Sequence, residues 1–238
     1  MIEFFLNFLP EKSPFLNLFS YLSTRTILAT LTGLIIVIFF GDYFINKIRS
    51  LQFKQSIGDR GPESHKAKDG TPTMGGLLVV GAVIFSGLLW GDLSSKYILI
   101  SLFCLISFGL IGFVDDYKKI QEKNSKGISS QTKLFYQFIA ACAISIALFM
   151  TASSEAEYYY IVPFFKDVFL DFGFWFVFIS IFIIVGSSNA VNLTDGLDGL
   201  AILPVIIITA ALGVIAWASG NVIAADYLYI PFVEGTGE

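Results

Sequence analysis

The sequence predicts an all-α, polytopic membrane protein with its N-terminus outside the cytoplasm. Three observations predict this fold class. First, 55% of the 238 residues are hydrophobic and only 14% are charged, and the mean hydropathy is +0.74, which is atypical of a soluble domain. Second, the chain contains six apolar runs near the length that a bilayer requires, about 20 residues. Third, Lys and Arg are concentrated in alternate connecting segments.

Each apolar run is expected to be a helix, because backbone polar groups in lipid must be satisfied within a helix or a closed barrel. The sequence contains no internal repeat. We therefore interpret residues 1–238 as one integral membrane domain. The six predicted spans are Thr26 to Ile45, Met74 to Trp90, Ile98 to Val114, Leu134 to Met150, Phe172 to Val191 and Leu200 to Ser219.

The connecting segments alternate between basic and nearly uncharged. Segment 46–73 carries six Lys and Arg residues and segment 115–133 carries five, whereas Lys96 and Lys166 are the only basic residues in the two segments that alternate with them. Because cytoplasmic loops are enriched in Lys and Arg, we expect segments 46–73 and 115–133 in the cytoplasm. Alternation alone places segment 192–199, which has no Lys or Arg, on the same side.

Asp115 and Asp116 follow directly after the third predicted span. Carboxylates are costly in hydrocarbon, and adjacent carboxylates repel unless a cation or a retained proton relieves the repulsion. Oxygen ligands of this kind suit Mg²⁺, which often bridges carboxylates and substrate phosphates, and one Asp could act as a base toward a phosphate nucleophile. The alternative is an ordinary solvated helix end. The pair is therefore a candidate catalytic and metal-binding site.

A second polar cluster lies between the fifth and sixth spans. Asn192, Asp195 and Asp198 recur every three residues, and Gly196 and Gly199 follow the two acids. In a helix these three side chains would share one side, while the glycines make a loop or a broken helix start equally plausible. Either arrangement could bind a metal or accept hydrogen bonds from a sugar or base. The alternative is an N-capping turn before the sixth span.

A third element precedes the second span. Residues 66–76 read Lys-Ala-Lys-Asp-Gly-Thr-Pro-Thr-Met-Gly-Gly. Backbone N–H groups, threonine hydroxyls and the two lysines could hold a phosphate, although the order differs from a Walker A loop, in which the Lys follows the glycines. A basic anchor followed by a turn is the alternative.

At three blocks, the chain resembles the phospho-N-acetylmuramoyl-pentapeptide transferase (MraY) family of polyprenyl-phosphate sugar-1-phosphate transferases. The blocks are Lys68 to Gly76, Gly112-Phe-Val-Asp-Asp-Tyr117 and Asn189 to Leu200. The blocks occur in the family's order, and the resemblance extends over essentially all 238 residues. It implies transfer of phospho-MurNAc-pentapeptide from UDP-MurNAc-pentapeptide to undecaprenyl phosphate, giving lipid I and UMP, at the cytoplasmic face of a bacterial inner membrane. The implied partners are both substrates, the lipid bilayer and a second copy in a homodimer, with no nucleic acid.

The resemblance also assigns residue roles. Asp115 and Asp116 match paired acids implicated in catalysis, one of them a candidate base toward the lipid phosphate, and both are expected near the required Mg²⁺. Asn192, Asp195 and Asp198 match residues that line the nucleotide-sugar pocket. Lys68, Thr73 and Lys133 match further polar positions of that pocket.

The chain departs from the family in one respect. Members have about ten spans, and their later segments include an acidic loop with a principal Mg²⁺ ligand and a histidine-rich loop. The single histidine of this chain is His65. We therefore expect a fragment or a truncated reading frame, and little or no activity from the isolated piece, which a radiolabelled lipid I assay would test.

Three other functions fit parts of the pattern. A sister transferase that attaches GlcNAc-1-phosphate to the same lipid would keep both acidic clusters, although the Gly-Thr-Pro-Thr-Met-Gly-Gly block favours the muramoyl branch. A transporter or flippase would be expected to carry an ionisable group near mid-span, whereas Asp42 lies near the end of the first span. A non-catalytic scaffold would not need the acids at all.

Overall fold

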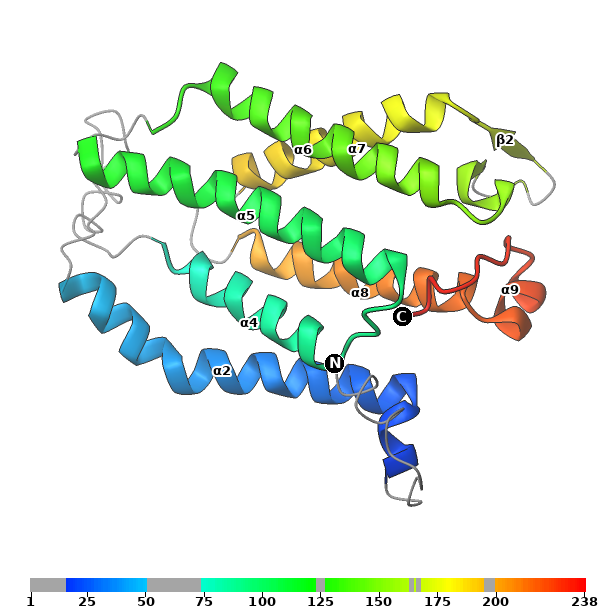
Figure 1. The fold of residues 1–238 in the computed structure, drawn as a ribbon, viewed down its shortest axis with the longest axis horizontal. Helices are drawn as coiled ribbons and strands as arrows, with labels where there is room; N and C mark the ends of the chain where they lie inside the picture. The colour runs from blue at the N-terminus through cyan, green and yellow to red at the C-terminus, as the bar shows by residue number, and fades with distance from the viewer. Residues whose placement is uncertain (1–15, 51–73, 123–126, 163–164, 166–167, 195–199) are drawn as a thin grey trace. The chain divides into compact units, whose positions relative to one another are not determined.

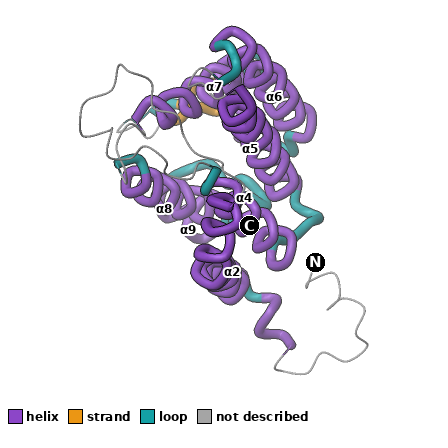
Figure 2. The backbone as a smooth tube through the Cα atoms, turned by 90° about the vertical axis from the view of Figure 1, so that its left-hand side faces the viewer, coloured by secondary structure: helices purple, strands orange, loops and turns teal. Residues whose placement is uncertain are grey.

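The computed structural model describes residues 16–50, 74–122, 127–162, 165, 168–194 and 200–238. Helices account for 78% of this part of the chain (Figures 1 and 2). The chain divides into two compact units. The first comprises Met1–Leu93 and Ser101–Gln137, and the second comprises Ser94–Ile100 and Phe138–Glu238. Helices α5 (Lys96–Glu122) and α6 (Ser130–Thr151) each contribute to both units.

The first unit is built on a pair of packed helices. Helix α2 (Leu22–Ser50) follows the short 3₁₀ helix η1 (Leu16–Ser20) and packs along α4 (Gly76–Trp90) (Figure 1). The indole N–H of Trp90 donates to the Thr32 hydroxyl at 2.9 Å, and Phe19 stacks on the same indole. A half-buried polar pair of this kind helps to fix the register of two largely apolar helices.

The second unit contains a small apolar core between α6 and α7 (Trp175–Thr194), formed by Ala141, Val177 and Ile181. The chain between these helices forms the 3₁₀ helix η2 (Glu155–Tyr158) and an antiparallel hairpin of β1 (Tyr159–Ile161) and β2 (Phe169–Asp171), in which Tyr160 pairs with Leu170. Helix α8 (Ile202–Ser219) and the short α9 (Val222–Leu228) complete the unit.

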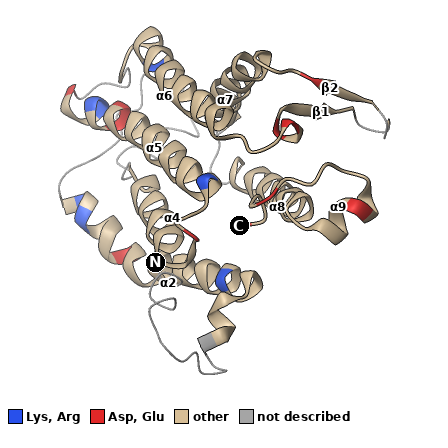
Figure 3. Cartoon of the chain, turned by 45° about the vertical axis from the view of Figure 1, so that its right-hand side comes forward, with Lys and Arg blue, Asp and Glu red and all other residues tan. Residues whose placement is uncertain are grey.

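The predicted all-α, multi-pass membrane fold is confirmed. Within the described residues, five helices (α2, α5, α6, α7 and α8) are long and apolar enough to cross a membrane. Helices α4, α7 and α8 carry no charged residue. Figure 3 shows the positions of charged residues mainly toward helix ends and in connections. Large apolar side chains face outward, such as Phe182 and Leu193. In lipid that exposure has no penalty, because the surrounding chains are also apolar.

Several predicted boundaries differ from the structure. The second span is a helix of only 15 residues, about 22 Å long, and it begins after Met74. Helix α5 continues past Val114 to Glu122, so Asp115 and Asp116 lie in a helix rather than in a loop over residues 115–133. Likewise α7 continues to Thr194 and includes Asn192, which was assigned to a loop over residues 192–199. The hairpin and α9 were not predicted.

An ion pair joins the start of α5 to the end of α6. The Lys96 ammonium donates to the Thr151 carbonyl at 2.6 Å and lies 2.9 Å from the Glu157 carboxylate, which also accepts from the Ser153 N–H. Burial raises the pKa of Glu157, but the hydrogen bonds from the Ser153 N–H and Lys96 outweigh burial, and the pKa lies below its ordinary value of 4.5. The ionised carboxylate therefore stabilises the fold.

This ion pair predicts a pH-dependent stability. Because the folded-state pKa of Glu157 is depressed, its contribution is present above pH 4.5 and is lost as the pH falls through the folded pKa. We expect Glu157→Gln to lower the unfolding free energy at pH 7 by about 1–3 kcal/mol, with a smaller deficit below pH 4.5. Thermal unfolding in detergent measures this difference. Glu155→Gln is the control, because the Glu155 carboxylate is exposed and accepts a 3.3 Å hydrogen bond from the Tyr159 hydroxyl, which the amide oxygen of Gln can also accept. An equal effect from this control would contradict the prediction.

Candidate functional site

The acid pair lies in the last turns of α5. The Asp115 side chain is 11% exposed, whereas that of Asp116 is 39% exposed. Consecutive residues in a helix point about 100° apart, because one turn takes 3.6 residues. Helical geometry therefore gives two adjacent carboxylates different surroundings, one buried and one facing an open space.

Lys119 bridges the two acids. Its ammonium lies 2.7 Å from the Asp115 carboxylate and 3.0 Å from the Asp116 carboxylate. The spacings of four and three residues place all three side chains on neighbouring positions of one helix face. The cation that relieves repulsion between adjacent carboxylates is thus supplied by the helix itself in this structure.

Gly127 and Ile128, which come just before α6, lie against Asp115. The Ile128 N–H donates to Asp115 Oδ1 at 2.9 Å. Gly127 precedes it with a φ of +61°, and a Cβ built there would lie 2.5 Å from Asp115 Oδ1 and 2.8 Å from Lys119 Cε. Only glycine combines that left-handed conformation with so close an approach. Both Asp115 oxygens therefore have defined partners, one in Lys119 and one in the backbone.

Lys133 is held beside the pair by the start of α6. The Ser129 hydroxyl accepts from the Thr132 N–H at 3.2 Å, an N-cap that fixes the first turn of the helix. Lys133, which is half-buried, lies in that turn, and its charge attracts the Asp115 carboxylate. The structure thus brings together three of the predicted site residues, Asp115, Asp116 and Lys133.

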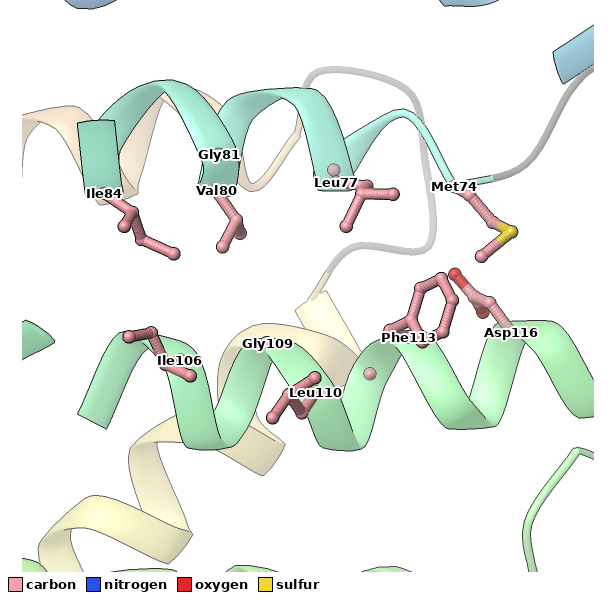
Figure 4. Close-up of a pocket in the computed structure, with 12 residues that line it drawn as sticks. Met74, Leu77, Val80, Gly81, Ile84, Ile106, Gly109, Leu110, Phe113 and Asp116 are labelled. Atoms are coloured by element: carbon pink, nitrogen blue, oxygen red, sulfur yellow. The ribbon is translucent and has the colours of Figure 1, made fainter. Parts of the chain in front are cut away.

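An apolar groove of about 550 Å³ lies between α4 and α5, and Asp116 is at one end of it. Figure 4 shows the side chains of the two helices facing one another across this space, with the Asp116 carboxylate close to Met74. Among the described residues that line the groove, Asp116 alone is charged. The groove is lined by Met74, Gly76, Leu77, Val80, Gly81, Ile84, Ile106, Gly109, Leu110, Gly112, Phe113 and Asp116.

The other predicted site residues are placed as follows. Asn192 is exposed near the end of α7, and in the preceding turn the Asn189 amide donates to the Val185 carbonyl of the same helix. Asp195, Asp198, Lys68 and Thr73 lie outside the described residues. The predicted position of the second acidic cluster on the same side of the membrane as Asp115 and Asp116 therefore stays a prediction.

The donor set that the described residues supply is compatible with magnesium bound by a few carboxylates together with other ligands. Within the described ranges, no group of three or more His, Cys, Asp or Glu side chains converges. Mg²⁺ commonly takes one or two carboxylates and completes its shell with waters and substrate phosphates. Asp115 and Asp116 satisfy that smaller requirement, and Asp116 retains one oxygen that does not contact Lys119.

Two parts of this site were missed by the sequence interpretation. Lys119 was read only as part of a basic loop, although its spacing from both acids identifies it as a helical ion-pair partner. The Gly127–Ile128 backbone contact gave no residue-type signal, because a backbone donor can belong to any residue except proline. The one indication in the sequence is Gly127, two residues before the N-cap Ser129, because glycine readily adopts the left-handed conformation that a tight connection needs.

One comparison with known proteins places these residues in a family. The family model for glycosyl transferase family 4, which comprises polyprenyl-phosphate sugar-1-phosphate transferases, matches residues 98–233. The matched segment is more than half of the chain and begins within α5. It contains Asp115, Asp116 and Lys133, as well as the second acidic cluster, whereas α4 precedes it.

Proposed function

Because the chain belongs to glycosyl transferase family 4, whose members transfer a sugar-1-phosphate to a polyprenyl phosphate, we propose that it transfers phospho-MurNAc-pentapeptide from UDP-MurNAc-pentapeptide to undecaprenyl phosphate. The products are lipid I and UMP. The observation that carries the proposal is the position of Asp116, where a charged cluster meets an apolar groove. A reaction between a water-soluble and a lipid substrate needs such a junction.

The residues of the cluster suit the chemistry. An oxygen of the lipid phosphate forms a bond to the β-phosphorus of the donor, and the bond from that phosphorus to the oxygen of UMP breaks. Two anionic reactants must approach each other, so Lys119 and Lys133 offset their repulsion. One carboxylate of the pair serves as the base toward the lipid phosphate, and its partner holds Lys119 in place. Phosphoryl transfer depends mainly on such positioning and charge stabilisation.

Asp116, with Asp115 behind it, would hold the magnesium ion that the family resemblance implies. When bound, Mg²⁺ would neutralise developing charge on the transferred phosphate. We expect chelation of divalent cations with EDTA to abolish formation of the lipid product, and added Mg²⁺ to restore it. Turnover that persists in excess EDTA after dialysis would contradict this part of the proposal. The measurement is transfer of radiolabelled sugar phosphate into butanol-extractable lipid.

The substrate assignment is tested by parallel assays of the full-length protein in nanodiscs with undecaprenyl phosphate. UDP-MurNAc-pentapeptide is expected to give a lipid product and UMP, and UDP-GlcNAc is expected to give none. The reverse result would select the GlcNAc-1-phosphate branch, which the second acidic cluster would also serve. Transport of a solute into proteoliposomes without polyprenyl phosphate would instead support a carrier.

We further propose that the reaction takes place on the cytoplasmic face of a bacterial inner membrane. The basic segments 46–73 and 115–133 support this orientation by their Lys and Arg content. A cysteine introduced at exposed Glu122 is expected to react with a membrane-impermeant maleimide only after the inner membrane is opened. Labelling in intact spheroplasts would overturn the orientation.

A further inference from the structure

We propose that the groove between α4 and α5 holds the part of the isoprenoid chain that adjoins the phosphate of the lipid substrate. The proposal rests on the proposed function for the identity of that substrate, a polyprenyl phosphate. It adds the site at which the hydrocarbon binds, and it places α4, which precedes the matched family segment, in substrate recognition.

The walls of the groove suit hydrocarbon. Aliphatic and aromatic side chains from both helices face the space, and the single charge lies at one end. A volume of about 550 Å³ is typical of a site for a small organic molecule, roughly 300–1,000 Å³. A long polyprenyl chain exceeds that size. The groove therefore accommodates the first isoprene units beside the phosphate, and the remainder of the chain stays in the bilayer.

Glycines give the groove its width. Gly76, Gly81 and Gly112 line it, and a Cβ built on any of them would have no neighbour within 4 Å, so the missing side chains leave open space. At Gly109 the walls come closer, because a Cβ there would lie 3.3 Å from Val80 Cγ1. Glycine weakens a helix relative to alanine. Three glycines that face open space in the walls of one groove are thus a local cost that an occupied groove explains.

The charged end of the groove selects the kind of occupant. Lys119 lies 3.0 Å from the Asp116 carboxylate, which lines the groove. A ligand with an isoprenoid chain and a phosphate would place its hydrocarbon between the helices and its anion within reach of Lys119. An apolar helix of another protein would fill the walls but leave the charged end without a partner. The junction therefore favours a lipid phosphate with a single slender chain.

Photocrosslinking tests the site directly. Farnesyl phosphate that carries a diazirine on its first isoprene unit is bound to the full-length protein in phosphatidylcholine nanodiscs and irradiated, and the labelled peptides are sequenced. We expect labels on α4 and α5 near Leu77 and Phe113, which lie next to Asp116 in the groove, displaced by undecaprenyl phosphate but not by phosphatidic acid. Labels elsewhere, or equal displacement by phosphatidic acid, would overturn the proposal. The latter result would identify an ordinary membrane lipid as the occupant.

Filling the groove gives an independent readout. Gly81→Leu and Gly112→Leu put a side chain into open space and are expected to raise the KM for undecaprenyl phosphate about tenfold or more, with the KM for the UDP-sugar unchanged. Gly213→Leu in α8, where a Cβ also meets nothing within 4 Å, is the matched control. An unchanged KM for the lipid in both groove variants would overturn the proposal.

The two proposals fail in different ways. Active enzyme with labels outside α4 and α5 would remove the groove and leave the transferase function intact. Displaceable labels in the groove without transfer from any UDP-sugar would leave the lipid site and remove the proposed reaction. Because crosslinking in the unaltered protein needs no turnover, a variant that fails to fold does not affect the decision.

Discussion

Asp115→Asn and Asp116→Asn are each expected to lower the kcat of sugar-phosphate transfer by about 10²–10⁴-fold, the range typical of removing a positioned acid–base group. Either change removes one of the two carboxylates that hold Lys119, at 2.7 Å and 3.0 Å. The loss should fall on kcat more than on the KM for either substrate, because charge stabilisation matters most in the transition state. Steady-state assays of the full-length protein in nanodiscs measure both constants.

Asp226→Asn is the matched control for this pair. Asp226 is an exposed carboxylate in α9, so the same chemical change is made away from the candidate site, and activity should stay within twofold or so of the unaltered protein. If lipid product formation survives Asp115→Asn and Asp116→Asn alike, the acid pair has no catalytic role. In that case the groups that catalyse the transfer must lie elsewhere in the protein.

The two substitutions should differ in stability. Asp115 is buried and accepts from the Ile128 N–H as well as from Lys119, so loss of its charge affects the connection between α5 and α6. Asp116 is more exposed and has the longer contact with Lys119. Asp115→Asn is therefore expected to lower the thermal midpoint in detergent more than Asp116→Asn does. A reversed order would show that Asp116 is the more strongly held group.

The sequence predicted the membrane fold because hydrocarbon imposes one dominant requirement, a run of about 20 apolar residues in a helix. It could not predict where helices end, since hydropathy reports where lipid ends and a helix can continue into water. Helix α5 shows this difference, for it extends through Asp115 and Lys119 to Glu122. The hairpin was also hidden, because its strands have three residues each and no alternation can be read over so short a length.

The candidate site also has parts that the sequence predicts and parts that it does not. Residue type and spacing predicted Asp115 and Asp116 as candidate site residues, because adjacent acids at the end of a span are costly. The groove was not predictable, since Gly81 and Gly112 resemble ordinary small residues of a membrane helix until the opposite wall is known. The Ile128 N–H likewise depends on a three-dimensional fold of the connection rather than on any side chain.

Gly127→Ala is expected to have the second large effect. A methyl group at this position would lie 2.5 Å from Asp115 Oδ1 in a backbone with φ of +61°, so either the connection or the carboxylate must move. We expect kcat to fall about 10²-fold, the scale of a misplacement of about 1 Å at a reacting group. The unfolding free energy should fall by about 1–3 kcal/mol from backbone strain. Steady-state kinetics and thermal unfolding measure the two effects separately.

Two further variants separate strain from contact. Gly173 has a φ of +44°, and a Cβ built there would have nothing within 4 Å. Gly173→Ala should therefore reproduce the backbone strain of Gly127→Ala without the loss of activity. Gly127→Asn tolerates the left-handed conformation better than alanine but keeps a Cβ against Asp115, so it should regain stability and remain poorly active. Recovery of activity in Gly127→Asn would mean that backbone strain alone impairs the site. If activity does not recover in Gly127→Asn, the close approach of residue 127 to Asp115 is what holds the carboxylate in its working position.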